Sequence, residues 1–183
     1  MVYYEDGTIR IRDMVQSDAH MITGAEIAQG WQQTIEKYEM RLRHQAEGKS
    51  IALVAEYRGA IAGYVNLYPN SGNGPFADRG YPEIVDFGVL EKYQKNGVGT
   101  KLMDIAEQIA SDYSDTVYLS VGLHSGYGSA QKLYVKRGYL PDGSGVWYRD
   151  EICPQYADCR NDDDLVLYFS KALRRRCTPS NSR

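Results

Sequence analysis

The most constraining feature of the sequence is a predicted strand, glycine-rich turn and helix over residues 83–110. Residues 83–89, Glu-Ile-Val-Asp-Phe-Gly-Val, form a short and mostly apolar run, which predicts a buried strand. From Val98 onward apolar residues recur at helical spacing, so we expect a helix directly after the glycines of residues 94–100. Such a turn directs backbone N–H groups and the positive end of a helix to one point, which suits a diphosphate.

Three patterns of nucleotide binding can be compared with this turn. A P-loop needs Gly-x-x-x-x-Gly-Lys-Ser/Thr, and the stretch lacks it. A dinucleotide-binding turn needs a third glycine where this chain has Leu102. What remains is Gln-x-x-Gly-x-Gly over residues 94–99, after a strand with an acidic first residue. Taken alone, this pattern also fits an ordinary turn that opens a helix.

The rest of the chain alternates strand patterns with helix patterns. In order, we expect a strand over 8–12, helices over 18–29 and 32–47, strands over 51–57, 60–68 and 83–89, a helix over 98–110, a strand over 116–121, a helix over 129–137, and strands over 146–149 and 165–170. This order, β-α-α-β-β-β-α-β-α-β-β, predicts an α/β fold (α+β, with a mixed sheet).

The first helix and the long middle loop carry more local expectations. Ser17 or Asp18 is expected to cap the first helix. Its inward residues are expected to be Met21, Ile22, Ala25 and Ala28. Residues 69–82 are rich in glycine and proline, which predicts a loop.

Length and composition predict one ordinary globular domain over residues 1–173, followed by a disordered basic tail over 174–183. The chain has 183 residues, of which 43% are hydrophobic and 25% charged. Its net charge of −3 argues against non-specific nucleic-acid binding and mildly favours a cationic substrate.

The expected location is the cytoplasm. No apolar run has the length of a membrane span, and the first six residues do not resemble a signal peptide. The three cysteines, Cys153, Cys159 and Cys177, are an odd number and are expected to be reduced thiols. Cys153 and Cys159 lack the second ligand pair that a zinc site needs, so we expect no metal.

A second motif makes the pattern specific. Residues 129–139, Ser-Ala-Gln-Lys-Leu-Tyr-Val-Lys-Arg-Gly-Tyr, match Ala-x-x-x-Tyr-x-x-x-Gly-Phe/Tyr through Ala130, Tyr134, Gly138 and Tyr139. This segment and the turn at residues 94–99, in this order and on these predicted elements, resemble the GNAT N-acetyltransferases. The motifs cover residues 83–140, and the resemblance elsewhere is in the order of elements.

The resemblance implies that the chain uses acetyl-CoA as cosubstrate and transfers its acetyl group to an amine. The backbone of Phe87, Gly88 and Val89 would bond the pantetheine arm, and an N–H group there would polarise the thioester carbonyl. The residues that would hold the diphosphate are Gln94, Lys95, Asn96, Gly97, Val98, Gly99 and Thr100. Ser125 or Ser129 would replace a pantetheine contact, because Tyr127 stands where many family members have asparagine.

Two side chains are candidates for proton transfer. In family members that use a strand glutamate as base, it lies where Glu83 lies here, and it commonly acts through water. Asp86 is the second candidate for this role. Tyr134 occupies the position that supplies a proton to the departing thiolate in many members. Each of these residues also has a plain alternative, which is to make a structural bond or to pack in the core.

The acceptor is not defined by the sequence. The expected activity is transfer to a primary amine of a small molecule or peptide by direct attack in a ternary complex. The alternatives are an aminoglycoside-type acetyltransferase, for which the acidic run over residues 162–164 would suit a polycation, and a non-catalytic CoA-binding module. No membrane partner is expected, and a homodimer is common in the family.

Overall fold

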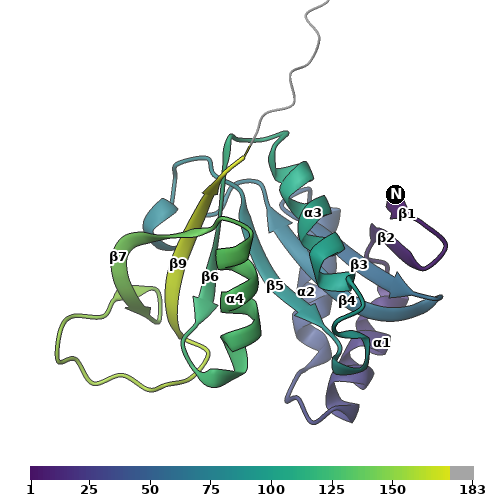
Figure 1. The fold of residues 1–183 in the computed structure, drawn as a ribbon, viewed down its shortest axis with the longest axis horizontal. Coiled ribbons are helices and arrows are strands. Elements are labelled where there is room, and N and C mark those ends of the chain that lie inside the picture. Colours follow the sequence, from purple (N-terminus) through teal and green to yellow (C-terminus); the bar gives the residue numbers. More distant parts are fainter. Residues whose placement is uncertain (174–183) are drawn as a thin grey trace, which may run out of the picture. The chain divides into compact units, whose positions relative to one another are not determined.

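The computed structural model describes residues 1–173, so the predicted tail at 174–183 lies outside the described residues. The elements are β1 (Val2–Glu5), β2 (Ile9–Asp13), α1 (Gln16–Ala28), α2 (Ile35–Ala46), β3 (Ile51–Tyr57), β4 (Ala60–Tyr68), β5 (Glu83–Val89), α3 (Val98–Ala110), β6 (Thr116–Gly122), α4 (Gly128–Lys136), β7 (Leu140–Tyr148), β8 (Glu151–Ile152) and β9 (Leu165–Ala172) (Figure 1). Every expected helix and strand is present, and β1 and β8 are additional.

The chain forms two compact units. The first contains residues 1–69 and 84–108, and the second contains residues 70–83 and the chain from Ile109 on. Strand β5 therefore crosses the division, with Glu83 in the second unit and Ile84 in the first. The prediction of a single domain over residues 1–173 stays a prediction.

The sheet of the first unit runs in the order β1-β2-β3-β4-β5, and the pairs from β1 to β4 are antiparallel. Helices α1 and α2 lie on its far face in Figure 1, and α3 lies in front. Behind the sheet, the core contains Met14, Ala19, Ile22, Tyr38, Ala52, Val54 and Tyr64. Because both faces are covered, strands β3 and β4 are apolar along most of their length.

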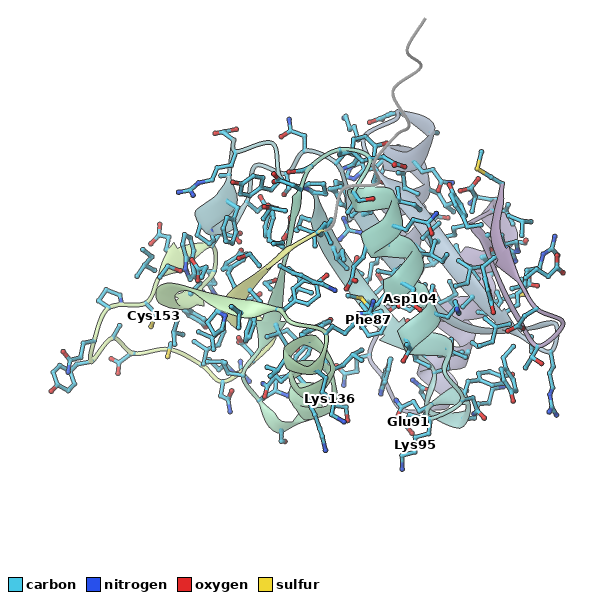
Figure 2. The ribbon with its side chains drawn as sticks, turned by 45° about the horizontal axis from the view of Figure 1, so that its top comes forward. Phe87, Glu91, Lys95, Asp104, Lys136 and Cys153 are labelled. Atoms are coloured by element: carbon cyan, nitrogen blue, oxygen red, sulfur yellow. The ribbon has the colours of Figure 1, made fainter. Side chains whose placement is uncertain are left out.

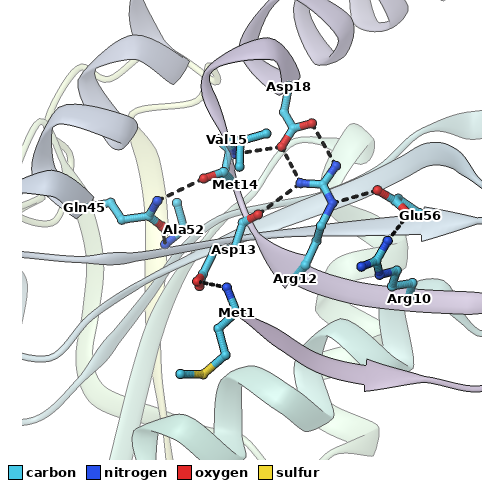
Figure 3. Close-up of polar contacts among 10 residues, drawn as sticks. All are labelled: Met1, Arg10, Arg12, Asp13, Met14, Val15, Asp18, Gln45, Ala52 and Glu56. Atoms are coloured by element: carbon cyan, nitrogen blue, oxygen red, sulfur yellow. Dashed lines mark hydrogen bonds and ion pairs between the residues drawn. The ribbon is translucent and has the colours of Figure 1, made fainter.

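A buried ion pair fixes α1 on this sheet (Figure 3). The guanidinium of Arg12 on β2 donates to both carboxylate oxygens of Asp18, at 2.6 and 2.9 Å, and to Glu56 on β3 at 2.7 Å. Asp18 also accepts the backbone N–H of Val15 at 2.8 Å. Asp18 thus closes the first turn of α1 from within the helix, and the predicted cap at Ser17 or Asp18 is wrong because the cap position is Val15.

A second polar contact joins α2 to the same strands. The amide of Gln45 donates to the carbonyl of Met14 at 3.0 Å and accepts the N–H of Ala52 at 2.9 Å (Figure 3). Helix α2 begins at Ile35, three residues later than expected at residue 32, because Thr34 has an extended backbone and stands at the cap position.

The sheet of the second unit runs in the order β6-β9-β7-β8, with antiparallel pairs throughout. Strand β7 begins at Leu140, earlier than the expected 146, and its register shifts between Pro141 and Val146. Gly143 and Gly145 have φ of 89° and 87° within that shift, so an irregular strand interrupts the sequence pattern. The core of this unit is aromatic and contains Phe76, Tyr118 and Tyr168.

Candidate active site

The predicted coenzyme turn lies in the first unit and has a left-handed backbone at two positions. Lys95 has φ of 63° and Gly97 has φ of 83°, and α3 begins at Val98. The side-chain amide of Gln94 donates to the carbonyl of Val89 at 3.3 Å, which ties the turn to the end of β5. The first N–H groups of a helix have no acceptor within the helix, so this turn has the form of an anion site.

Gly99 is packed directly onto β5. A Cβ atom added to Gly99 would lie 3.1 Å from Cζ of Phe87 and 3.3 Å from Cγ2 of Val89. Figure 2 shows Phe87 beside the first turns of α3, whereas the side chain of Lys95 points away from the protein. A glycine at this position therefore lets the turn approach the strand closely.

Backbone also approaches backbone between β4 and β5. A Cβ atom on Gly63 would lie 2.6 Å from the carbonyl oxygen of Gly88, and one on Gly88 would lie 3.0 Å from the ring of Tyr64. Phe87, Gly88, Val89 and the turn thus form one continuous region of the first unit. Its glycines carry no side chain that would shield the backbone, which suits a coenzyme that is held by main-chain groups.

Glu83, the predicted base, is held inside the second unit. Its side chain is buried, and its Oε2 accepts the hydroxyl of Ser71 at 2.5 Å. Burial, and next the charge of Glu83, raises the pKa of the Tyr118 phenol, and the same two causes raise the pKa of Tyr168. The carboxylate therefore has a hydroxyl donor and two neutral phenols around it.

Asp86, the second candidate for the base, lies in the first unit and is already engaged by cations. Nε of Arg41 donates to its Oδ2 at 2.7 Å, and Nζ of Lys37 lies 3.5 Å from its Oδ1. Arg41 also donates to the hydroxyl of Tyr68, which contacts Nδ1 of His44 at 2.7 Å. Both oxygens of Asp86 therefore have cationic partners.

The backbone at Asp86 is unusual for a strand. Its φ is 53°, a left-handed value that costs an ordinary residue of order 1 kcal/mol or more. Such strain persists only where the surroundings hold it, and here Arg41 and Lys37 of α2 hold the side chain. The irregular backbone turns Asp86 toward α2.

Tyr134, the predicted acid, lies on α4 in the second unit. Its side chain is buried, and its ring centroid lies 5.8 Å from that of Tyr139. Burial, followed by the neighbouring Tyr127, raises the pKa of the Tyr134 phenol. The phenol is therefore protonated throughout the physiological range, as a proton donor must be. Ser129 is exposed in the first turn of the same helix.

The loop that departs from the family pattern is anchored within its own unit. The hydroxyl of Tyr127 donates to Oδ1 of Asp163 at 2.9 Å, and Nε2 of His124 lies 2.9 Å from the same oxygen. A Cβ atom on Gly122 would lie 2.4 Å from the Tyr127 ring, so this ring needs glycine beneath it. Tyr127 thus takes a structural position where many relatives have a pantetheine contact.

Sequence reasoning missed Ser71 and Glu26. Ser71 lies in a loop without periodicity, and only its contact with Glu83 reveals it. Glu26 is fully buried on α1 and accepts the hydroxyls of Tyr38 and, at 2.8 Å, of Tyr64. Because a carboxylate was not expected in the core, the predicted inward face of α1 was partly wrong, and Met21 is instead 49% exposed.

Metal binding and membrane spanning were also considered in the predictions. Among residues 1–173, no group of three or more His, Cys, Asp or Glu side chains is arranged to hold a metal ion. Within the same residues, no helix is both long and apolar enough to cross a membrane.

Comparison with known proteins identifies the family. Residues 17–139 match the model of the acetyltransferase (GNAT) family, so the chain belongs to this family. The family and the fold that the two motifs predicted are thus confirmed, with acetyl-CoA as the cosubstrate that the family implies.

One sequence relative and two solved structures of similar fold can be named. The chain is 34% identical over 76 residues to the beta-lysine N(6)-acetyltransferase of Methanococcus maripaludis, and the match covers 42% of this chain and 27% of that protein. An acetyltransferase from Salmonella typhimurium that modifies the N-terminal serine of ribosomal protein L7/L12 has a TM-score of 0.69 at 8% identity, covering 95% of this chain and 100% of that one. RimL, an L7/L12 alpha-N-protein acetyltransferase solved with coenzyme A, gives 0.69 at 8% identity, covering 94% and 98%.

Proposed function

We propose that the protein transfers an acetyl group from acetyl-CoA to a primary amine of a small molecule or peptide, by direct attack in a ternary complex. The observation that carries the proposal is the buried Glu83 carboxylate, bonded to Ser71 at the start of a strand that leads to the coenzyme turn of a GNAT protein. The amines named for two relatives, a side-chain amine and an N-terminal amine, support a primary amine as the class.

The amine must lose a proton before it can attack. A lysine-like amine has a pKa near 10.4, so only about one molecule in 10³ is neutral at pH 7. In the proposal, the carboxylate of Glu83 accepts this proton, directly or through a water molecule. A base placed in this way contributes roughly 10²- to 10⁴-fold to the rate.

The departing thiolate of the coenzyme needs a proton in return. In the proposal, the phenol of Tyr134 donates it, and the raised pKa of this buried group keeps it in the donor form. The bound coenzyme supplies the thioester that carries the acetyl group. Main-chain N–H groups of the turn over residues 94–100 hold its diphosphate, and the backbone at Phe87, Gly88 and Val89 holds its pantetheine arm.

The aminoglycoside alternative finds less support. The carboxylates over residues 162–164 have partners within their own unit: Asp162 accepts the N–H of Asp164 at 3.1 Å, Asp163 contacts His124 and Tyr127, and Asp164 lies 3.6 Å from Arg149. These contacts give the side chains a structural role within their own loop, which is the simpler explanation of the acidic run. The cytoplasmic location and the homodimer remain predictions.

A thiol-release assay with acetyl-CoA tests the proposal. The amine panel is L-lysine, spermidine, a peptide that starts with serine, and kanamycin. We expect turnover of at least one amine, with kcat/KM lowered about 10²-fold at pH 7 by Glu83→Gln and less at pH 10, where the amine itself loses its proton. If acetyl-CoA binds with the same affinity to the wild type and to Tyr134→Phe, and no amine is turned over, the non-catalytic module is the better description.

A further inference from the structure

The loop before β5 binds the carboxylate of Glu83 through one hydroxyl group. Ser71 is 7% exposed and Glu83 is 5% exposed, so the 2.5 Å contact between Oγ and Oε2 is sheltered from water. A hydrogen bond from a hydroxyl to an ionised acceptor is among the stronger ones, and its strength grows in a buried site.

The hydroxyl of Ser71 makes a second contact. The backbone N–H of Asn73 donates to Oγ of Ser71 at 3.4 Å, which uses the hydroxyl oxygen as an acceptor. Because an ionised carboxylate can only accept, the single hydroxyl hydrogen of Ser71 points to Glu83 when Glu83 is charged. The carbonyl of Asn73 in turn accepts the Tyr118 hydroxyl at 3.2 Å, so the loop is held from β6 as well.

Two phenols also interact with Glu83. Tyr118 comes from β6 and Tyr168 from β9, and the charge of Glu83 is among the causes that raise the pKa of each. Asp142 and Asp150 act on Tyr168 from β7 and the turn after it. The phenols stay neutral at physiological pH, and hydrogen bonding to Glu83 and to Ser71 also acts on the pKa of Tyr118, so Ser71 and Tyr118 together place hydroxyl groups around the carboxylate.

We propose that Ser71 is a positioning residue for the reaction, which fixes the orientation of the Glu83 carboxylate and keeps it ionised as the proton acceptor. This inference rests on the proposed role of Glu83 as base. A hydrogen bond to the charged form of an acid favours that form, so loss of the Ser71 hydroxyl should make Glu83 easier to protonate.

The test is a set of pH profiles of kcat/KM for the wild type, Ser71→Ala, Glu83→Gln and the double variant, with the fastest amine of the panel. Ser71→Ala should lower the rate about tenfold at the acid end of the profile and less than about threefold at the alkaline end. In the Glu83→Gln background, Ser71→Ala should have no further effect on the pH profile, because the ionisable carboxyl group on which Ser71 acts is gone. Ser71→Thr, which keeps a hydroxyl, should restore most of the acid-end rate.

Ser50→Ala is the matched control. Ser50 is 4% exposed, and within the described chain its hydroxyl has no hydrogen-bond partner. This variant should leave the profile unchanged. Titration of ¹³C-labelled glutamate carboxyl groups, with the Glu83 signal assigned from its loss in Glu83→Gln, gives a readout that needs no amine. The Glu83 midpoint should rise in Ser71→Ala and stay in place in Ser50→Ala.

The contrary results have different meanings. Suppose that Glu83→Gln changes the pH profile, but Ser71→Ala lowers the rate equally at every pH or equally in both backgrounds. Ser71 then does not act through Glu83, and the inference about Ser71 fails while the proposed base stands. If Glu83→Gln leaves the rate and its pH dependence as in the wild type, the proposed base is wrong, and the role of Ser71 falls with it. An unmoved Glu83 midpoint in Ser71→Ala also overturns the inference.

Discussion

Gly99→Ala should weaken acetyl-CoA binding without unfolding the protein. The added Cβ would lie 3.1 Å from the Phe87 ring and 3.3 Å from Val89. Ordinary carbon contacts are about 3.5–4.0 Å, so the turn must move off β5 by roughly 0.4 Å. That shift lengthens the hydrogen bonds from the first-turn N–H groups to a bound diphosphate.

The magnitude follows from the bonds affected. Hydrogen bonds to charged groups contribute about 1.5–3 kcal/mol each, and partial loss across two of them costs about 1–1.5 kcal/mol, which is roughly a five- to tenfold rise in Kd. Alanine is favoured over glycine in a helix by about 0.8–1 kcal/mol, which offsets much of the steric cost to folding. We therefore expect a clear loss of affinity with little change in the free energy of unfolding.

Isothermal titration calorimetry with acetyl-CoA, alongside urea unfolding, measures both quantities. Gly24→Ala on α1 is the control, because a Cβ atom there would have nothing within 4 Å. This control should stabilise the protein slightly and leave Kd unchanged. A Kd for Gly99→Ala within twofold of the wild type would refute the reasoning, and so would an affinity loss matched by general unfolding.

Two further predictions concern stability and proton donation. Asp18→Asn should lower the free energy of unfolding by about 3 kcal/mol, because Asp18 is fully buried and Arg12 would lose its main partner. The control Glu5→Gln breaks an exposed ion pair at 3.8 Å and should cost less than about 0.5 kcal/mol. Urea unfolding measures both losses, and equal losses would contradict this prediction. Tyr134→Phe should lower kcat about 10²-fold. Because burial raises the pKa of this phenol, the ratio of the wild-type kcat to the variant kcat should not decline up to pH 10. A decline of this ratio between pH 7 and 9 would show that the phenol ionises there and is not the donor.

Strong periodicity explains why parts of the fold could be predicted. Helix α3 follows its apolar stripe, and Val98, Leu102 and Ala106 are buried as expected. Helix α1 has a weaker apolar pattern, because Glu26 is buried on its inward face and its carboxyl group accepts hydrogen bonds from two tyrosines distant in sequence. No local sequence pattern predicts a buried carboxyl group of this kind, because its hydrogen-bond partners come from α2 and β4.

Parts of the candidate site could likewise be predicted from the sequence, and other parts could not. The position of the coenzyme turn could be predicted from its glycines, because a close approach of backbone segments needs residues without a side chain. The left-handed backbone of Lys95 and Asp86 could not be predicted, since neither residue type demands it. The role of Ser71 could not be predicted either, because it depends on a contact with Glu83 that only the fold creates. A serine in a glycine- and proline-rich loop does not by itself indicate such a contact.

The most direct test of the whole account compares the affinity of the wild-type protein for acetyl-CoA with that for S-acetyl-4′-phosphopantetheine and for S-acetylpantetheine, which lack the 3′-phosphoadenosine with, respectively, one and both phosphates of the diphosphate. If main-chain groups between Gln94 and Thr100 hold the diphosphate, acetyl-CoA should bind at least about 10²-fold more tightly than S-acetylpantetheine, as expected from the loss of several charge-assisted hydrogen bonds. Equal affinities, or no detectable binding of acetyl-CoA, would contradict it.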